Sequence, residues 1–395
     1  TTTATANNVS FSAALLSQGL NTGLVLPVLN VTSNQVFVVD TNPLLTAAFV
    51  TVSPAVQTVG QQVTAILRVT NQNTIISASN VSVTATGTLP GLLGALASAV
   101  QPALLGTLGA GASADFTFRY TMTSTSQLTA TAQASLGAAA TATSTAVTVQ
   151  QGVSLTVESM SLMPAVVSAG QTFTMIVTVS NHGSGLATAV GVSPVTLVKN
   201  GTAGTAVLSA VTPASAVLAS GLWQDFTYTG VAVAGTGSGP WNLGYNALAK
   251  GFDANSGVAV QAADYGASSL IQVKKAAALS ATLALGATLR NVGQTFAVTM
   301  TVQNTGGTDA LVVAPSALSL IGTPVALLQT GPTPANQTVQ AGQSKDFVWI
   351  YSAVGSGVVA LQGSASGNDA NSNAPVASNL TTSANLTVQA PADLQ

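Results

Sequence analysis

The sequence predicts an all-β protein of three β-sandwich domains in tandem, preceded by a β-rich N-terminal extension. Three observations predict this fold class. A unit is repeated three times, apolar and polar residues alternate within each unit, and the chain is rich in Thr and Val punctuated by turn signals. A unit of about 100 residues with several short strands is typical of one sandwich.

The first landmark of the repeat is a segment that opens with Gly-Gln and closes with Asn. It occurs with the same spacing at Gly60–Asn71, Gly170–Asn181 and Gly293–Asn304. Each copy alternates apolar with mostly polar residues, the apolar ones in the first copy being Val63, Ala65, Leu67 and Val69. This period of two predicts a strand with one buried face.

Two further landmarks follow in register. An Asp-Phe pair follows a Gly at the same distance in every unit, and the three acids are Asp115, Asp225 and Asp346. We expect these carboxylates to cap backbone N–H groups at a strand start or turn. An Asp-x-Asn-Ser element occurs only in the second and third units. We therefore place an N-terminal extension at 1–45 and domains at 46–150, 152–275 and 276–391.

Together, the Gly-Gln strand ending in Asn, the Asp-Phe pair and Asp-Ala-Asn-Ser resemble tandem immunoglobulin-like repeats of bacterial and archaeal surface proteins. They are similar to the cell-adhesion-related (CARDB-type) sandwich modules. The resemblance covers about residues 50–390. It implies three immunoglobulin-like domains in an extracellular or cell-surface protein. Members of such families are mostly non-catalytic spacers, stalks, adhesins or assembly subunits. The first unit departs from the pattern, with Ser135–Ala138 near the position of the missing element.

The composition excludes several function classes. Charged residues make up only 5% of the chain, and eight Lys+Arg face ten Asp+Glu. Nucleic-acid binding needs a basic footprint, which eight scattered cations do not supply. The chain has no Cys, which excludes disulfides and thiolate metal sites. The uncharged run from Leu89 to Gly111 is broken by Pro and Gly, so we expect no membrane span.

Catalytic and cofactor signals are weak, so we predict no enzyme and no cofactor. His182 is the only histidine, and its Asn-His-Gly context predicts a turn residue. The Asp-x-Asn elements resemble the front half of a calcium loop but lack the later bidentate Glu. We expect them to be turns, with weak calcium binding left open at Asp253, Asn255, Asp369 and Asn371.

Aromatic residues offer one candidate contact for a ligand. Each of the three tryptophans could stack on a sugar. Trp223 and Trp349 lie at the Asp-Phe strand, where we expect a core or inter-sheet role instead. Trp241 follows Gly-Pro, with Tyr245 nearby, and is the best candidate for an exposed aromatic in a loop. The stretch Leu92–Val100 has the spacing of a short helix, although its counterparts in the other units do not.

The N-terminal extension matches none of the three units and contains two apolar segments. A strand of this kind predicts strand addition to a neighbouring copy, or packing on the chain's own first sandwich, and both alternatives stay open. The residues predicted to take part in self-assembly are Val9, Phe11, Ala13, Leu15, Leu24, Leu26 and Val28.

The near-absence of charge predicts that other copies of the protein cover much of its surface. Soluble monomers mix both charges on their surfaces, and sandwiches guard open edges with Lys, Pro or bulges. We therefore predict an extracellular structural protein whose main partner is itself, assembled into a surface filament or layer. The alternative is a monomeric stalk or adhesin that binds a glycan or protein through loops such as Gly239–Tyr245.

Overall fold

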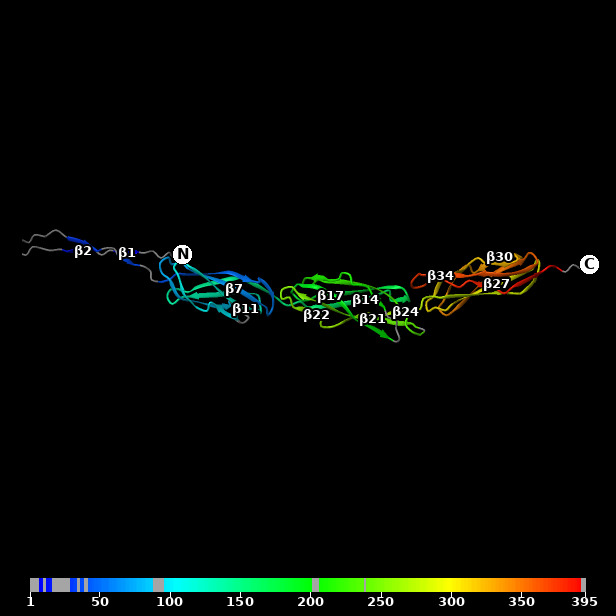
Figure 1. Ribbon diagram of the computed structural model, residues 1–395, viewed down its shortest axis with the longest axis horizontal. Helices are drawn as coiled ribbons and strands as arrows, with labels where there is room; N and C mark the ends of the chain where they lie inside the picture. The colour runs from blue at the N-terminus through cyan, green and yellow to red at the C-terminus, as the bar shows by residue number, and fades with distance from the viewer. Residues whose placement is uncertain are drawn as a thin grey trace, which may run out of the picture. The chain divides into compact units, whose positions relative to one another are not determined.

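The computed structural model describes residues 7–9, 12–15, 29–33, 36–38, 42–87, 96–200, 206–237 and 239–391. Within these ranges the chain consists of strands, turns and loops, without a helix (Figure 1). The all-β prediction is therefore confirmed. The chain divides into two compact units, Thr1–Gly152 and Val153–Gln395. No helix of the described residues is long and apolar enough to cross a membrane.

The first unit begins with a two-stranded antiparallel ribbon, which we call the N-terminal ribbon. Its outer strands pair with each other and its inner strands pair with each other. The pairs are β1 (Asn7–Val9) with β4 (Val36–Val38), and β2 (Ser12–Leu15) with β3 (Leu29–Thr32). Ladder pairing of these four strands is confined to the ribbon itself among the described residues.

The first sandwich of strands completes this unit, and its two sheets enclose one hydrophobic core. One sheet has the order β5 (Leu45–Ser53), β7 (Gln62–Asn71), β11 (Ser113–Thr121), β9 (Leu96–Gln101). The other has the order β10 (Leu105–Leu108), β8 (Ala78–Gly87), β12 (Ser126–Gln133), β13 (Ala140–Gln150), β6 (Val56–Thr58).

The second unit begins with a second sandwich. One of its sheets has the order β14 (Leu155–Met163), β16 (Thr172–Asn181), β20 (Trp223–Val231), β18 (Val207–Leu208). The other has the order β15 (Val166–Ser168), β24 (Ile271–Lys274), β21 (Trp241–Asp253), β17 (Ala187–Asn200), β19 (Ala216–Leu218). Two short strands also pair with β21, namely β22 (Ala259–Gln261) and β23 (Gly266–Ala267).

A third set of strands completes the second unit around its own core. One sheet has the order β25 (Leu279–Leu285), β27 (Thr295–Asn304), β32 (Ser344–Ala353), β30 (Ala326–Thr333). A second has the order β26 (Leu289–Asn291), β37 (Leu386–Gln389), β33 (Gly357–Gly363), β29 (Ser319–Gly322), with β36 (Thr381–Thr382) on β33. The last has the order β31 (Gln337–Val339), β28 (Ala310–Pro315), β34 (Ala365–Asp369), β35 (Pro375–Ala377).

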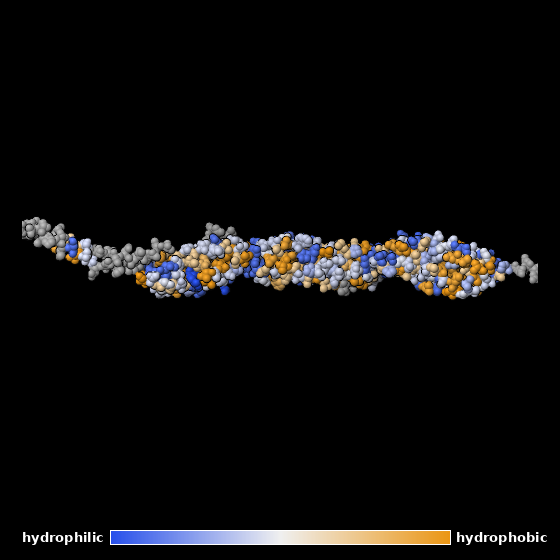
Figure 2. Space-filling view, turned by 90° about the horizontal axis from the view of Figure 1, so that it is seen from above, coloured by the Kyte–Doolittle hydropathy of each residue, from blue (hydrophilic) through white to orange (hydrophobic). Residues whose placement is uncertain are grey.

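Alternation along β7, β16 and β27 places one face of each strand in a core, as the sequence predicts. In β7 the four alternating residues Val63, Ala65, Leu67 and Val69 are fully buried. Burying a Val or Leu side chain stabilises the fold by about 1.5–3 kcal/mol. Apolar side chains that remain outside are interspersed with polar ones over the surface of each unit (Figure 2). The predicted domain boundaries stay a prediction.

The Gly-Gln pair that opens each repeat forms the turn before the long strand. Gly60, Gly170 and Gly293 have φ values of 83°, 88° and 88°. No heavy atom lies within 4 Å of where a Cβ would stand, so backbone conformation and not space requires glycine here. The following Gln closes the same turn in two copies. The Gln171 Oε1 accepts the N–H of Ser168, and the Gln294 Oε1 accepts that of Asn291.

The helix predicted at Leu92–Val100 is wrong where the structure describes it. Residues 96–100 belong to β9, which pairs with β11 through residues such as Ser98 and Arg119. Leu92 lies outside the described residues. Helical spacing of a few apolar residues was misleading here because a ladder with a neighbouring strand satisfies the backbone just as fully.

Candidate functional site

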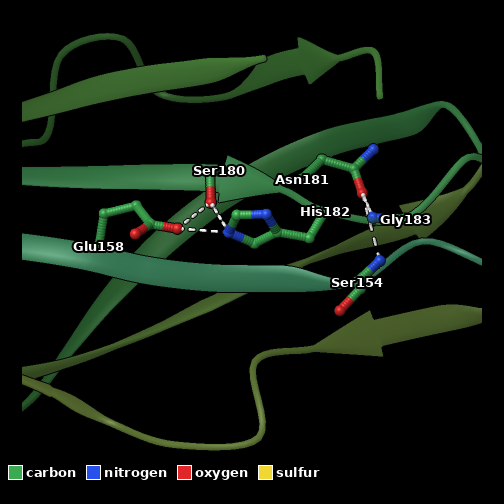
Figure 3. Close-up of polar contacts among 6 residues, drawn as sticks. All are labelled: Ser154, Glu158, Ser180, Asn181, His182 and Gly183. Carbon is green, nitrogen blue, oxygen red and sulfur yellow. Dashed lines mark hydrogen bonds and ion pairs between the residues drawn. The ribbon is translucent and has the colours of Figure 1, made fainter. Parts of the chain in front are cut away.

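The closing Asn of each repeat is a buried structural residue. Asn181 donates from Nδ2 to the carbonyls of Gly185 and Leu218, at 2.8 and 3.1 Å. Its Oδ1 accepts the N–H groups of Ser154 and Gly183, at 3.2 and 3.0 Å (Figure 3). Asn304 makes the same four kinds of contact in the third set of strands. This amide therefore ties together the entry of a sandwich, a turn and a distant strand.

The Asp-Ala-Asn-Ser elements form turns, and their carboxylates are occupied by protein donors. The Oδ1 of Asp369 accepts the N–H groups of Asn371 and Ser372 and the hydroxyls of Ser372 and Ser168. Its Oδ2 accepts the N–H of Ala277. A calcium ion needs six to eight oxygen ligands that are free to turn toward it. These donors occupy acceptor sites of Asp369 that a calcium ion would also use.

Asp253 occupies the corresponding turn of the second sandwich and is equally buried. Its Oδ1 accepts the N–H groups of Asn255 and Ser256, and its Oδ2 accepts the N–H of Val153. In the described residues no group of three or more His, Cys, Asp or Glu side chains is placed to hold a metal ion. The four calcium candidates lie in turns, and calcium binding at them stays a prediction.

The three Asp-Phe aspartates are structural, but they do not cap backbone N–H groups as expected. Asp225 accepts the hydroxyl of Thr178, directly opposite on β16, at 2.7 Å. Asp346 accepts the hydroxyl of Thr301 in the same way. Asp115 forms a two-pronged ion pair with Arg68, and both contacts are 2.8 Å. The guanidinium hydrogen bonds lower the pKa of Asp115. Cross-strand pairing therefore decides the role of these acids.

Two of the three tryptophans, Trp223 and Trp241, do not lie where the sequence predicted. Trp241, the expected exposed aromatic, is 4% exposed, and its indole N–H donates to the carbonyl of Thr236 at 3.2 Å. Tyr245 is also buried. Trp349 is in the core as expected. Trp223 is 64% exposed, so its predicted core role is wrong. It stands at the start of β20, directly opposite Ser180.

His182 lies in the predicted turn after β16, and its side chain joins a cluster that sequence reasoning missed. Its ring points back over β16 toward Ser180 and Glu158, while the neighbouring Asn181 points the other way (Figure 3). The His182 Nε2 is 2.6 Å from the Glu158 Oε1 and 3.0 Å from the Ser180 hydroxyl oxygen. The Ser180 hydroxyl also donates to the same carboxylate oxygen. Glu158 and His182 are the only glutamate and histidine in the chain.

An irregularity in β14 brings Glu158 to this position. The register between β14 and β16 shifts between Val157 and Ser159, which leaves Glu158 as the extra residue of a bulge. Bulges commonly redirect a side chain. In the third set of strands the equivalent pair β25 and β27 runs without a shift. The signal in the sequence, one acid within an otherwise uncharged strand, gives no indication of its partner.

The cluster does not have the geometry of a catalytic triad. The hydrogen bond from Ser180, and to a smaller extent that from His182, lowers the pKa of Glu158. The ionised carboxylate can only accept hydrogen bonds. The proton between His182 and Glu158 therefore lies on Nε2. In a serine-histidine-acid triad that nitrogen must be free to take the serine proton, and the acid binds Nδ1 instead. Here Ser180 donates to the acid, and His182 is not free to act as its base.

Trp223, the cluster and the Thr178–Asp225 pair lie on one surface, which we call the Trp223 face. It is the outer side of the neighbouring strands β14, β16 and β20, and its members are Glu158, Thr178, Ser180, His182, Trp223 and Asp225. The core-facing residues of β16, such as Val177 and Val179, point to the other side. The period of two along each strand therefore gathers these polar groups and the indole on the side away from the core.

Three of the seven predicted self-assembly residues lie in described strands of the N-terminal ribbon. Val9 ends β1, while Ala13 and Leu15 lie in β2 with exposed side chains, Leu15 being 69% exposed. Phe11, Leu24, Leu26 and Val28 lie outside the described residues. Both β1 and β2 are already paired within the ribbon. The described side chains of the ribbon are exposed.

Comparison with known proteins identifies no family. No family model matches the chain, and no curated protein matches it. The resemblance to CARDB-type modules therefore stays a prediction.

Several solved structures are similar at low identity. One is the Escherichia coli adhesin FdeC, at 16% identity and a TM-score of 0.30, covering 87% of this chain and 96% of that one. A structure titled BspA_C_WT has 10% identity and a TM-score of 0.23, covering 59% and 98%. The native E. coli alpha-2-macroglobulin has 10% identity and a TM-score of 0.22, covering 97% of this chain but 29% of that one. With identities and TM-scores this low, function must be argued from the chain's own features.

Proposed function

We propose that this protein is a non-catalytic, extracellular structural protein that assembles with copies of itself into a filament or layer through its N-terminal ribbon. The observation that carries the proposal is the ribbon itself. It has two strands, its described side chains are exposed, and they include the apolar Leu15 and Val31. A two-stranded hairpin alone is marginally stable in water, and a third strand stabilises it. The ribbon therefore needs a partner.

The sequence of the ribbon favours another sheet as that partner. No charged residue occurs before Asp40. Exposed strand edges usually carry Lys, Pro or a bulge, because a row of unpaired N–H and C=O groups pairs readily with a further strand. An uncharged ribbon with outward leucine and valine suits addition to the sheet edge of a second copy, where main-chain hydrogen bonds supply the affinity.

The edge strand β30 is the acceptor that we favour. It pairs with β32, and no strand pairing is described along its other edge. Its first residues, Ala326–Leu328, are the part suited to strand addition, because the register shifts and Pro332 come after them. Leu327 and Leu328 are exposed on it. No charged residue occurs between Asp309 and Lys345. Contacts between an N-terminal element of one copy and a C-terminal domain of the next are head-to-tail, and such contacts form open filaments when they do not close.

Negative-stain electron microscopy of four forms tests the proposal. These are the full chain, a chain that begins at Asn42, Leu327→Lys, and the control Leu136→Lys, which charges an exposed leucine of the first sandwich. We expect regular filaments or sheets from the full chain and the control, and single particles from the other two. Single particles in every sample would refute self-assembly. Filaments from the shortened chain would refute the ribbon joint. Filaments from Leu327→Lys, with single particles from the shortened chain, would refute only the β30 acceptor.

The alternative of a monomeric adhesin was based on the loop Gly239–Tyr245, but Trp241 and Tyr245 are buried and do not present an aromatic surface to a ligand. Any ligand-binding role moves to the exposed aromatic that the chain does have, Trp223.

A further inference from the structure

The Trp223 face concentrates functional groups that are rare in this chain. It holds the only glutamate, the only histidine and the one exposed tryptophan of three. At the position of Trp223 the other two repeats have Ser113 and Ser344, which pair with Thr70 and Gln303 on the neighbouring strands β7 and β27. The fold therefore does not require the indole, the imidazole or the glutamate, since two sister sandwiches form the same sheet without them.

The groups on this face match the two kinds of surface that a sugar ring offers. An exposed indole presents a flat apolar ring that stacks on the C–H face of a pyranose, together with an N–H donor. Sugar hydroxyls both donate and accept. Glu158 retains acceptor capacity after its bonds to Ser180 and His182, because a carboxylate has about four acceptor sites. Asp225 likewise keeps acceptor capacity after its bond to Thr178.

Other ligand classes fit less well. Two carboxylates repel phosphate, which excludes nucleic acids and other polyanions. A cation would be attracted to the carboxylates and to the indole face, but it could use no donor. The Ser180 hydroxyl and the His182 Nε2–H are already directed at Glu158, and the exposed Trp223 indole keeps an N–H donor. Carboxylate acceptors next to an aromatic ring with an N–H donor favour a neutral polyhydroxylated ligand.

The shape of the face favours a polymer. Trp223, Ser180 and Glu158 come from three adjacent strands, and neighbouring strands are about 4.8 Å apart. The row therefore spans about 10 Å across the sheet, the length of a disaccharide. Small-molecule sites are usually concave, whereas this site is the outer face of a sheet, over which an extended chain can lie.

We infer that the Trp223 face is a binding site for a neutral polysaccharide, with Trp223 stacking on one sugar and Glu158 and Asp225 accepting hydrogen bonds from its hydroxyl groups. This inference does not depend on self-assembly, because the face lies in the second sandwich and contains no residue of the N-terminal ribbon or of β30.

Isothermal titration of the full-length chain with four hexasaccharides tests the inference. The probes are cellohexaose, laminarihexaose, mannohexaose and chitohexaose, with hexalysine as the cationic comparison. We expect at least one hexasaccharide to bind at one site per chain. Trp223→Ala should weaken binding at least tenfold, Trp223→Phe less, and Glu158→Gln at least threefold. Tyr265→Ala, which removes another exposed aromatic of the same sandwich, should leave binding unchanged.

Three results would overturn the inference. These are no binding of any hexasaccharide, equal binding by wild type and Trp223→Ala, and equal weakening by Tyr265→Ala. Binding of hexalysine alone, lost in Trp223→Ala, would identify a cationic ligand instead and would also refute the polysaccharide. An unchanged melting curve for Trp223→Ala, expected for an exposed residue, separates lost binding from lost folding.

Discussion

At the scale of single residues, the repeated Asn and Gly positions are explained by backbone geometry. Asn181 and Asn304 are fully buried and use both ends of the amide, each joining four backbone groups. Only a side chain with donors and an acceptor in fixed arrangement satisfies this set. In the first sandwich the Nδ2 of Asn71 donates to the carbonyls of Ile76 and Leu108, and its Oδ1 accepts the N–H of Asn73. Asn71 therefore also uses both ends of its amide to join backbone groups.

Replacing Asn304 by Ala should therefore destabilise the third set of strands by about 3 kcal/mol. The substitution removes four hydrogen bonds and leaves buried N–H and C=O groups without partners, each of which costs about 1–3 kcal/mol before relaxation and water entry. Urea unfolding, followed by the fluorescence of the buried Trp349, measures the change. The neighbouring exposed Gln303→Ala is the control and should change the free energy of unfolding by less than about 0.5 kcal/mol. Equal effects of the two substitutions would contradict this role for Asn304.

At the scale of elements, the N-terminal ribbon differs from every other sheet in the described chain. The sandwich strands bury one face in a core, whereas Ser12–Leu15 and Asn30–Thr32 are exposed on both faces. Val31 is 59% exposed in the middle of β3. Strand pairing within the ribbon satisfies part of the backbone, but without a core its stability must come from a partner.

We expect hydrogen exchange in the ribbon to depend on assembly. In dispersed chains, such as Leu327→Lys, amides of β2 and β3 should exchange rapidly because local opening of an isolated hairpin costs little free energy. In assembled full-length protein the same amides should be slowed at least tenfold. Mass spectrometry of peptides from β2 and β3 measures this, with β27 as an internal reference protected in both samples. Slow exchange of the ribbon in dispersed chains would show that it needs no partner.

At the scale of the whole molecule, a polar joint connects the two parts of the second unit, the second sandwich and the third set of strands. Ser168 at the end of β15 donates to the buried Asp369 at 2.7 Å, and Thr308 lies 3.2 Å from the same hydroxyl. Gln171 donates to the carbonyl of Asn371 across this joint. Because a buried carboxylate is stable only with its partners in place, Asp369 couples its own turn to β15 of the preceding sandwich.

The joint should make the stability of Val153–Gln395 depend on pH. Burial raises the pKa of Asp369, but hydrogen bonds from Ser372, Ala277 and Ser168 together outweigh it and lower the pKa below its ordinary value. A lowered folded-state pKa means that the ionised carboxylate stabilises the fold above its unfolded-state pKa. That stabilisation is lost as pH falls through the lowered value.

Thermal melting between pH 7 and pH 2 tests this dependence. We expect Asp369→Asn to cost about 2 kcal/mol at pH 7 and to flatten the loss of stability below about pH 4. The exposed Asp264→Asn is the control and should leave the pH profile as in the wild type. Parallel profiles for wild type and Asp369→Asn would show that this carboxylate does not carry the acid sensitivity.

Much of the fold could be predicted from the sequence because its signals are local. A period of two specifies a strand with one buried face, and a Gly-Gln turn specifies where the strand begins. The same period distinguishes the two tryptophans near the Asp-Phe pairs. Trp223 lies an odd number of residues before the core-facing Phe226 and so faces outward, whereas Trp349 lies two residues after the buried Phe347 and faces the core. The prediction of a core role for Trp223 did not take this alternation into account.

The sequence by itself determined an all-β chain with little charge, three copies of one strand unit and an uncharged leading segment, because composition, period and spacing are properties of neighbouring residues. Only the tertiary structure decided that Glu158, Ser180, His182 and Trp223 share one face, and that the leading segment pairs with itself. The physical reason is that register and bulges between strands distant in sequence bring these side chains together, and long-range pairing leaves no mark in any local pattern.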